Sequence, residues 1–190
     1  MKIGVMGARG SFSEEAGRTY ATKYASAKKY TIEYLITAER VLSALTRGAI
    51  DIGIFPIENS NGGVVTEYLP AIAEHQFTID KIFEIPVDHM LLVTKGTHAA
   101  DITKIVSQRQ ALRQCRMYLA RQWPNTEVEE YIDTATAAKD LSEGKLPPTA
   151  AVVASARAGD VYGLDTLESK IQDLKFNYTV FIAAKKFVSQ

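Results

Sequence analysis

The sequence is short of the features that mark several large classes of protein. It has one cysteine, Cys115, so no disulfide forms within the chain, which favours a reducing, cytoplasmic location. Its 22 basic and 22 acidic residues give a net charge of zero, which argues against a nucleic-acid-binding surface. No apolar run approaches the roughly 20 residues of a membrane span, and we expect no leader peptide before the first strand. The sequence predicts a cytoplasmic protein without membrane or nucleic-acid partners.

Metal and cofactor signatures are also absent from the sequence. Its histidines, His75, His89 and His98, have no ligand spacing with Cys115. It has no glycine-rich signature for a bound phosphate either. We therefore expect chemistry that uses neither a metal nor a cofactor.

Strands and helices alternate along the 190 residues, which is enough chain for one domain or two small lobes. This alternation predicts an α/β fold with mainly parallel sheets and helices on both faces. An extended stretch around Pro86 and a late final strand suggest that the chain crosses to a second lobe and returns. We expect strands at 2–6, 30–35, 50–55, 78–87, 90–94, 102–107, 127–131, 150–153 and 178–183, and helices at 13–24, 38–47, 64–75, 110–121, 134–143 and 154–162.

Two polar, glycine-bearing turns follow predicted strands. The first carries Ser11 and Ser13, and the second follows Pro56 with Glu58, Asn59 and Ser60. A helix N-terminus has unpaired N–H groups and a positive dipole end, so two such turns suggest a site for a small anion. The alternative is a pair of ordinary turns whose serines and asparagine cap helices. Ser11 and Glu14 have the spacing of a capping box.

Several short motifs, each weak alone, occur together and in a familiar order. In that order and spacing the chain resembles the catalytic part of the prephenate dehydratase family. It departs from that family at Val180, where Thr-Arg-Phe is usual, and at Ser107, where His-Pro often precedes the glutamine. The motifs are Gly10-Ser11-Phe12-Ser13-Glu14-Glu15-Ala16, Pro56-Ile57-Glu58-Asn59-Ser60, Gln110-Ala111-Leu112-Arg113-Gln114-Cys115-Arg116-Met117-Tyr118-Leu119, Asp133-Thr134-Ala135-Thr136-Ala137-Ala138, Ala154-Ser155, Tyr162-Gly163-Leu164, Ile171-Gln172-Asp173 and Asn177-Tyr178-Thr179-Val180-Phe181.

The resemblance implies two α/β lobes of the periplasmic-binding-protein type II kind, with the site in the cleft. We expect residues 1–77 plus 165–190 in one lobe and 78–164 in the other, with Ser11, Ser60 and Thr179 converging on one cleft. It also implies a homodimer. Family members often carry a C-terminal ACT domain that senses phenylalanine, and none follows the last motif here. Either the protein lacks that regulation or the sequence is truncated.

The activity that the resemblance implies is that of a lyase in phenylalanine biosynthesis. Prephenate, a dicarboxylate, loses its ring hydroxyl and one carboxylate and becomes phenylpyruvate. Thr179 matches the catalytic threonine, whose hydroxyl donates to the leaving oxygen. The substrate-binding residues that the resemblance implies are Ser11, Ser13, Asn59, Ser60, Gly62, Thr134 and Ser155; of these, Thr134 and Ser155 begin helices of the second lobe and equally suit simple capping.

Other functions remain open at this point. Arogenate, with an amino group in place of the ketone, is an alternative substrate. A prephenate decarboxylase-like enzyme or a non-catalytic anion-binding protein is the other alternative. Neighbours in a strand point to opposite faces, so Val180 faces away if Thr179 faces the cleft. Loss of the arginine then implies lower activity, another substrate, or a compensating cation such as Arg109. We expect Cys115 in the core and Gln114 facing the cleft.

Overall fold

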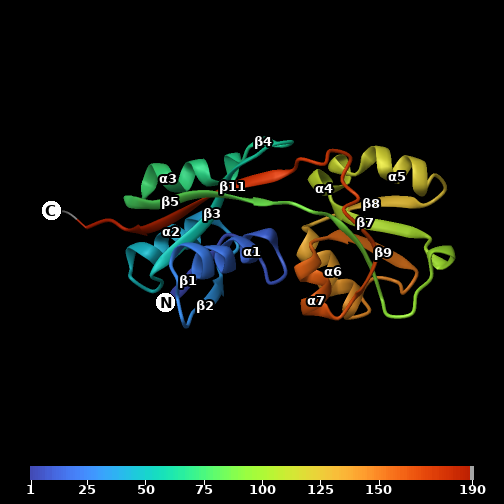
Figure 1. The fold of residues 1–190 in the computed structure, drawn as a ribbon, viewed down its shortest axis with the longest axis horizontal. Helices are drawn as coiled ribbons and strands as arrows, with labels where there is room; N and C mark the ends of the chain where they lie inside the picture. The colour runs from blue at the N-terminus through green and yellow to red at the C-terminus, as the bar shows by residue number, and fades with distance from the viewer. Residues whose placement is uncertain (189–190) are drawn as a thin grey trace. The chain divides into compact units, whose positions relative to one another are not determined.

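The computed structural model describes residues 1–188, and the chain divides into two compact units. The first unit contains Met1–Ala8, Phe12–Pro86 and the segment that starts at Tyr178. The second contains Arg9–Ser11 and Val87–Asn177. Figure 1 shows the course of the chain through both.

The boundaries of these units differ from the predicted ones. Residues 78–86 belong to the first unit because β5 (Phe77–Pro86) is hydrogen-bonded along its length to β11 (Tyr178–Lys186). Residues 165–177 belong to the second unit, where β10 (Asp165–Ser169) pairs with β6 (Met90–Val93). Strand pairing, which composition does not reveal, decides both boundaries.

The sheet of the first unit has the strand order β2-β1-β3-β11-β5, with β4 paired to β3. β1 is parallel to β2 and β3, whereas β11 is antiparallel to β3 and β5. The elements of this unit are β1 (Lys2–Val5), α1 (Phe12–Thr19), the π-helical turn η1 (Tyr20–Tyr24), β2 (Thr31–Tyr34), α2 (Ala38–Thr46), β3 (Ile52–Asn59), β4 (Gly63–Val64), the 3-10 turn η2 (Thr66–Tyr68), α3 (Leu69–Glu74), β5 and β11.

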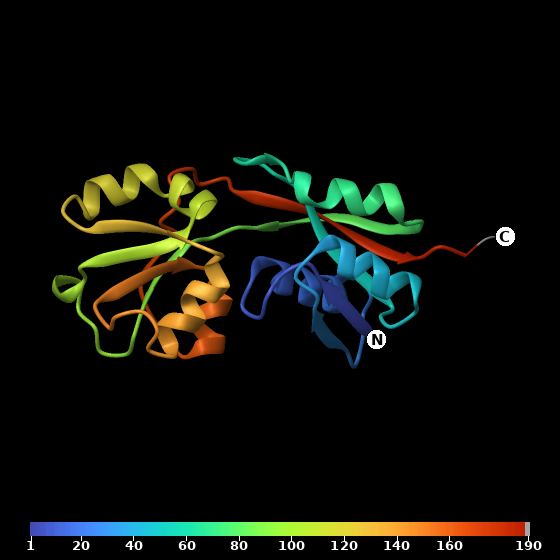
Figure 2. The same ribbon diagram turned by 180° about the vertical axis from the view of Figure 1, so that it is seen from behind.

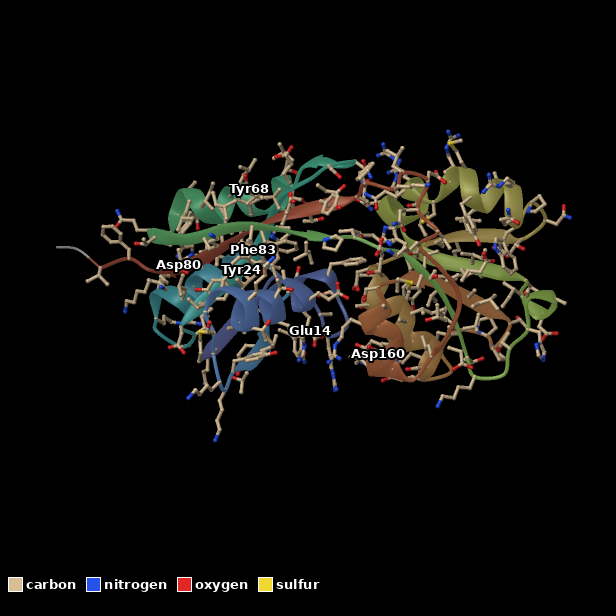
Figure 3. All side chains as sticks on the ribbon, viewed as in Figure 1. Glu14, Tyr24, Tyr68, Asp80, Phe83 and Asp160 are labelled. Carbon is tan, nitrogen blue, oxygen red and sulfur yellow. The ribbon has the colours of Figure 1, made fainter. Side chains whose placement is uncertain are left out.

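Helices cover both faces of this sheet. On one face, Ala16 and Tyr20 of α1 and η1 pack against Ile54, Phe83 and Phe181. On the other, the buried side of α2 and part of α3 pack against Phe55, Ile182 and Ala184. Figure 3 labels Tyr24, Phe83 and Asp80 within this unit, where the rings of Tyr24 and Phe83 lie 5.2 Å apart. The core therefore fixes β3 and β11, the two strands that carry Asn59 and Thr179.

The sheet of the second unit has the strand order β10-β6-β9-β7-β8. Helices α6 and α7 pack on one of its faces, and α4 and α5 pack on the other (Figure 2). Within residues 1–188, no helix combines the length and apolar character needed to cross a membrane. The elements of this unit are β6, the 3-10 turn η3 (Ala99–Asp101), β7 (Lys104–Gln108), α4 (Arg109–Gln114), α5 (Arg116–Gln122), β8 (Glu127–Tyr131), α6 (Thr134–Ser142), β9 (Ala150–Ala154), α7 (Ala156–Tyr162) and β10.

The predicted α/β class with two sheet-containing units is confirmed, with one difference in strand direction. Parallel pairs join β1 to its neighbours and β7 to its neighbours. The pairs made by β5, β6, β10 and β11 are antiparallel. Each sheet is mixed because the chain enters and leaves the second unit through extended segments rather than through helices.

Candidate functional site

Asn59 and Thr179 lie opposite each other where β3 ends and β11 begins. The antiparallel register pairs the two residues directly. The Asn59 Nδ2 donates to Thr179 Oγ1 at 2.9 Å and to the Tyr178 carbonyl oxygen at 3.0 Å. Thr179 is only 8% exposed. A hydroxyl held at one position in a largely water-excluded setting is what a hydrogen-bond donor to a reacting oxygen requires.

The other end of the Asn59 amide is also occupied. Its Oδ1 accepts from the backbone N–H groups of Asn61 at 3.0 Å and Gly62 at 2.8 Å. The side chain therefore closes the turn on one side and holds Thr179 on the other. These contacts fix the orientation of the amide and suit Asn59 to positioning Thr179 rather than to holding a substrate itself.

Ser60 and Gly62 lie in a hairpin turn, not at the start of a helix. β3 runs through Pro56 to Asn59, turns, and pairs with β4. The next helical residues are the 3-10 turn η2 and then α3, which begins at Leu69. The predicted helix over 64–75 is therefore wrong in its first part, and with it the anion argument from a helix N-terminus at Ser60. Left-handed Gly63 and a strand partner make the turn a hairpin.

Ser60 is tied to the same strand as Thr179. Its backbone N–H donates to the Tyr178 carbonyl oxygen at 2.9 Å, and its Oγ accepts from the Tyr178 N–H at 3.0 Å. The Ser60 side chain is exposed and keeps its own proton available for donation. The structure thus brings Asn59, Ser60 and Thr179 together in the first unit.

In the second unit, Ser155 joins the turn at Gly10 to the start of α7. Its Oγ accepts from the Ala158 N–H at 3.0 Å, as an N-cap, and donates to the Gly10 carbonyl oxygen at 2.6 Å. Tyr162 Oη donates to the Arg9 carbonyl oxygen at 2.8 Å. Gly10 has φ of +86° and packs so closely that a Cβ would meet the Cα of Ala158 at 3.1 Å. The proton of Ser155 is therefore used inside the chain, to hold the Gly10–Ser11 turn.

The remaining predicted residues are spread over different elements. Ser13 is buried in the first turn of α1, and half-buried Ser11 belongs with the second unit. Thr134 is the first residue of α6, but Asp133 is its cap and accepts from the Thr136 N–H at 2.8 Å. Glu14 is fully buried and its carboxylate accepts from Arg18 Nε at 2.7 Å.

Val180 lies between two carboxylates. It pairs with Glu58 on β3 and with Glu84 on β5, and both glutamates are exposed. Strand alternation places these three side chains on the face opposite to Thr179. Arg109, the cation considered as a substitute, is exposed on α4 in the second unit, where its Nε lies 3.6 Å from Glu130 Oε1.

A buried polar cluster in the second unit was not predicted. Gln114 Oε1 lies 2.7 Å from His89 Nε2 and accepts from Asn177 Nδ2 at 3.1 Å. Gln172 Oε1 accepts from the His89 backbone N–H at 3.0 Å. The carbonyl-type acceptor assigns the imidazole proton to Nε2. Burial lowers the pKa of His89, so this histidine is neutral.

The sequence motifs contained Gln114, Gln172 and Asn177, but nothing in the sequence joins them to His89. Gln114 was expected to face the cleft. In the structure, its side-chain oxygen accepts from Asn177 and lies at hydrogen-bond distance from His89. Cys115 next to it is fully buried in the core, as predicted, and burial raises the pKa of its thiol to about 12. In residues 1–188, no group of three or more histidine, cysteine, aspartate or glutamate side chains is placed to hold a metal ion.

A family model and several sequence relatives match this chain. The family model described as prephenate dehydratase matches residues 3–187. The bifunctional chorismate mutase/prephenate dehydratase of Stutzerimonas stutzeri is 31% identical over 182 residues, which cover 96% of this chain and 48% of that protein. Arogenate dehydratase 5 of Arabidopsis thaliana is 33% identical over 184 residues, covering 96% and 41%.

A solved structure agrees with the sequence relatives. The prephenate dehydratase of Arthrobacter aurescens, solved in complex with L-Phe, superposes with a TM-score of 0.88 at 27% identity. The match covers all of this chain and 61% of that one. This chain spans about half the length of the curated relatives that it matches.

Proposed function

We propose that this chain, which belongs to the prephenate dehydratase family, converts prephenate into phenylpyruvate, carbon dioxide and water. The observation that carries the proposal is the hydrogen bond from the Asn59 amide to the Thr179 hydroxyl, at 2.9 Å. It joins two of the family motifs and prepares one hydroxyl for donation. Family membership and the names of the sequence relatives support the reaction class.

The reaction needs little from the protein beyond binding and orienting the substrate and stabilising the leaving group. The bond from the ring carbon to its carboxylate breaks and leaves its electron pair in the ring. The bond from the opposite ring carbon to oxygen breaks, and the hydroxyl leaves with its pair as hydroxide and takes a proton to form water. The ring becomes aromatic, which drives the step. Catalysis therefore consists of binding a dianion and stabilising the departing oxygen.

Thr179 is the group that we assign to the departing oxygen. Its Oγ1 accepts the hydrogen bond from Asn59, so its own proton points elsewhere and is free to donate. A threonine hydroxyl is a weak acid, and its contribution is a positioned hydrogen bond that strengthens as charge develops on the leaving oxygen. The amide of Asn59 acts as a positioning group behind it.

The substrate carboxylates need donors from the remaining polar residues. We assign Ser11, Ser13, Ser60 and Thr134 to this task because each carries a hydroxyl and lies in or next to a turn. Ser155 and Gly62 contribute differently. Ser155 holds the Gly10 turn, and the Gly62 N–H orients the Asn59 amide.

The test follows both products of the reaction. Purified protein is incubated with prephenate, and the phenylpyruvate absorbance is recorded beside carbon dioxide release. Equal amounts of both products support the proposal. Carbon dioxide without the aromatic product means a decarboxylase, and no reaction at all leaves a binding protein; either result overturns the proposal.

Thr179→Val tests the assigned residue. We expect kcat to fall by about 10²-fold with KM nearly unchanged, as for loss of one positioned donor. Thr179→Ser keeps the hydroxyl and is the matched control. Wild-type turnover in Thr179→Val would show that Thr179 is only a strand residue.

Arogenate is a second candidate substrate because sequence relatives of this chain include arogenate dehydratases. The two substrates differ in one group, an amine in place of a ketone. Side-by-side kcat/KM values for prephenate and arogenate decide between them, and we expect the higher value for prephenate.

A further inference from the structure

A groove in the second unit, which is lined by none of the residues assigned to the reaction, combines an apolar floor with arginines at its rim. It lies along α4, α5 and β8 and has a volume of about 630 Å³. Leu112, Leu119, Trp123 and Val128 line it, together with Arg113, Arg116 and the paired side chains of Arg109 and Glu130. We call it the arginine groove.

The two rim arginines differ from the neighbouring cations. Lys104 lies 2.6 Å from Glu129, and Arg109 lies 3.6 Å from Glu130. Among the residues that the structure describes, neither Arg113 nor Arg116 forms an ion pair. Two guanidinium groups beside one groove, without a carboxylate partner, attract an anion.

The floor of the groove indicates what else the ligand must carry. Leu112 and Leu119 are buried, but Val128, on the edge strand β8, is 47% exposed. The half-buried Trp123 adds an aromatic surface at the end of α5. An inorganic anion would leave this apolar surface in water, whereas a ligand with a ring would cover it.

We propose that the arginine groove binds an aromatic monocarboxylate. The ring packs against Trp123, Leu119 and Val128, and the carboxylate accepts paired N–H bonds from Arg113 or Arg116. The volume suits a small molecule, since ligand pockets measure roughly 300–1,000 Å³. This proposal does not depend on the proposed reaction, because no residue that lines the groove is assigned to that reaction.

The sequence supplies a direct probe of this groove. Trp123 is the only tryptophan in the chain, so its fluorescence reports the groove alone. Titration with 3-phenylpropanoate is expected to give a saturating change in emission. The double variant Arg113→Gln/Arg116→Gln is expected to weaken apparent affinity by tenfold or more, because both carboxylate donors are lost. Both side chains are on the surface, so the fold should survive, and circular dichroism checks it.

Matched controls separate this site from other causes. Arg121→Gln removes a cation of α5 that does not line the groove, and Thr179→Val alters the proposed active site. Both variants should bind the acid like the wild type. The neutral 3-phenylpropanamide should bind at least tenfold more weakly than the acid. The proposal is overturned if the acid gives no saturating change, if the double variant binds as well as the wild type, or if inorganic phosphate gives the same change at the same concentration.

Discussion

In the proposed site, the residues around Thr179 divide into those expected to contact the substrate and those that hold them in place. Both ends of the Asn59 amide form hydrogen bonds within the chain. The nitrogen donates to Thr179 and Tyr178, and the oxygen accepts from the Gly62 N–H. We therefore expect its effect on the reaction to pass mainly through the threonine hydroxyl. This separation gives a quantitative test, because two residues that act through one hydroxyl are not additive.

We expect Asn59→Ala to lower kcat by about 10- to 100-fold, because the Thr179 hydroxyl loses the bond that aims it. In a Thr179→Val background, the same change should cost little more. Steady-state kinetics of the single and double variants measure this, with urea unfolding beside it because Asn59 also closes a hairpin. A full additional loss in the double variant would show that Asn59 contacts the substrate independently.

The position of Val180 leads to a prediction about stability rather than turnover. A cation at this position would lie between Glu58 and Glu84, its cross-strand neighbours, rather than unpaired on a packed face. We expect Val180→Arg to leave the unfolding free energy unchanged or to raise it by up to about 1 kcal/mol, as for exposed ion pairs. The side chain faces away from Thr179, so turnover should change little.

The urea midpoint at low and at high salt measures this prediction for Val180. Val180→Glu is the matched control, since it adds a third carboxylate between two others and should lower the midpoint, more so at low salt. A large rise in turnover on adding the arginine would contradict the geometry. It would mean that residue 180 acts on the substrate.

At the scale of secondary-structure elements, the polar cluster of His89, Gln114 and Asn177 joins three parts of the second unit. His89 follows the end of β5, Asn177 precedes β11, and Gln114 ends α4. The cluster therefore ties both connections of the second unit to one helix. Burial keeps His89 neutral in the folded chain, with a pKa below its ordinary 6.5, against the opposing effects of the Gln114 hydrogen bond and of the Asp88 charge.

The stability of these connections should depend on pH in one direction. Below the ordinary pKa of 6.5, the unfolded chain takes up a proton at this histidine that the folded chain does not. Stability should then fall as pH drops from 6.5 to the lower folded-state pKa, by up to about 1.4 kcal/mol per pH unit. Urea unfolding between pH 7.5 and 5 measures the slope. His89→Gln should flatten it, and exposed His98→Gln should not; equal slopes in both variants would refute the assignment.

The sequence predicted elements well where local periodicity decides them. Ala38–Thr46 has its apolar residues on one helical face and a Thr37 cap, and it forms α2 close to the predicted 38–47. Prediction was wrong where a strand pairing overrides a local pattern. Residues 63–64 became β4 because the turn after Asn59 returns the chain to β3. The strand β10 was missed because its exposed, polar sequence gains strand structure only by pairing with β6.

The sequence proposed the residues of the candidate site but not their contacts. Thr179 and Asn59 were identified through motifs shared with a family. Their hydrogen bond joins residues 120 positions apart and depends on the register of β3 with β11. No local pattern carries that register. For the same reason, the use of the Ser155 proton on Gly10, across 145 positions, was not foreseen.

On the scale of the whole molecule, strand β5 is a candidate contact surface for the expected homodimer. β5 is an edge strand of the first sheet, ten residues long. Its Ile79 and Ile82 are 49% and 52% exposed. An edge strand presents a row of unpaired N–H and C=O groups, and exposed apolar residues on it favour pairing with another strand.

We therefore expect a homodimer in which β5 of one copy pairs antiparallel with β5 of the other. Multi-angle light scattering over a range of concentrations should give twice the mass of the 20.9 kDa chain. Ile82→Lys places a charge in the contact and should shift the mass to the monomer. The matched control is Ile132→Lys, since Ile132 is 79% exposed but lies in the second unit outside any strand. A monomer mass at every concentration would refute the dimer, and a dimer that survives Ile82→Lys would place its contact elsewhere.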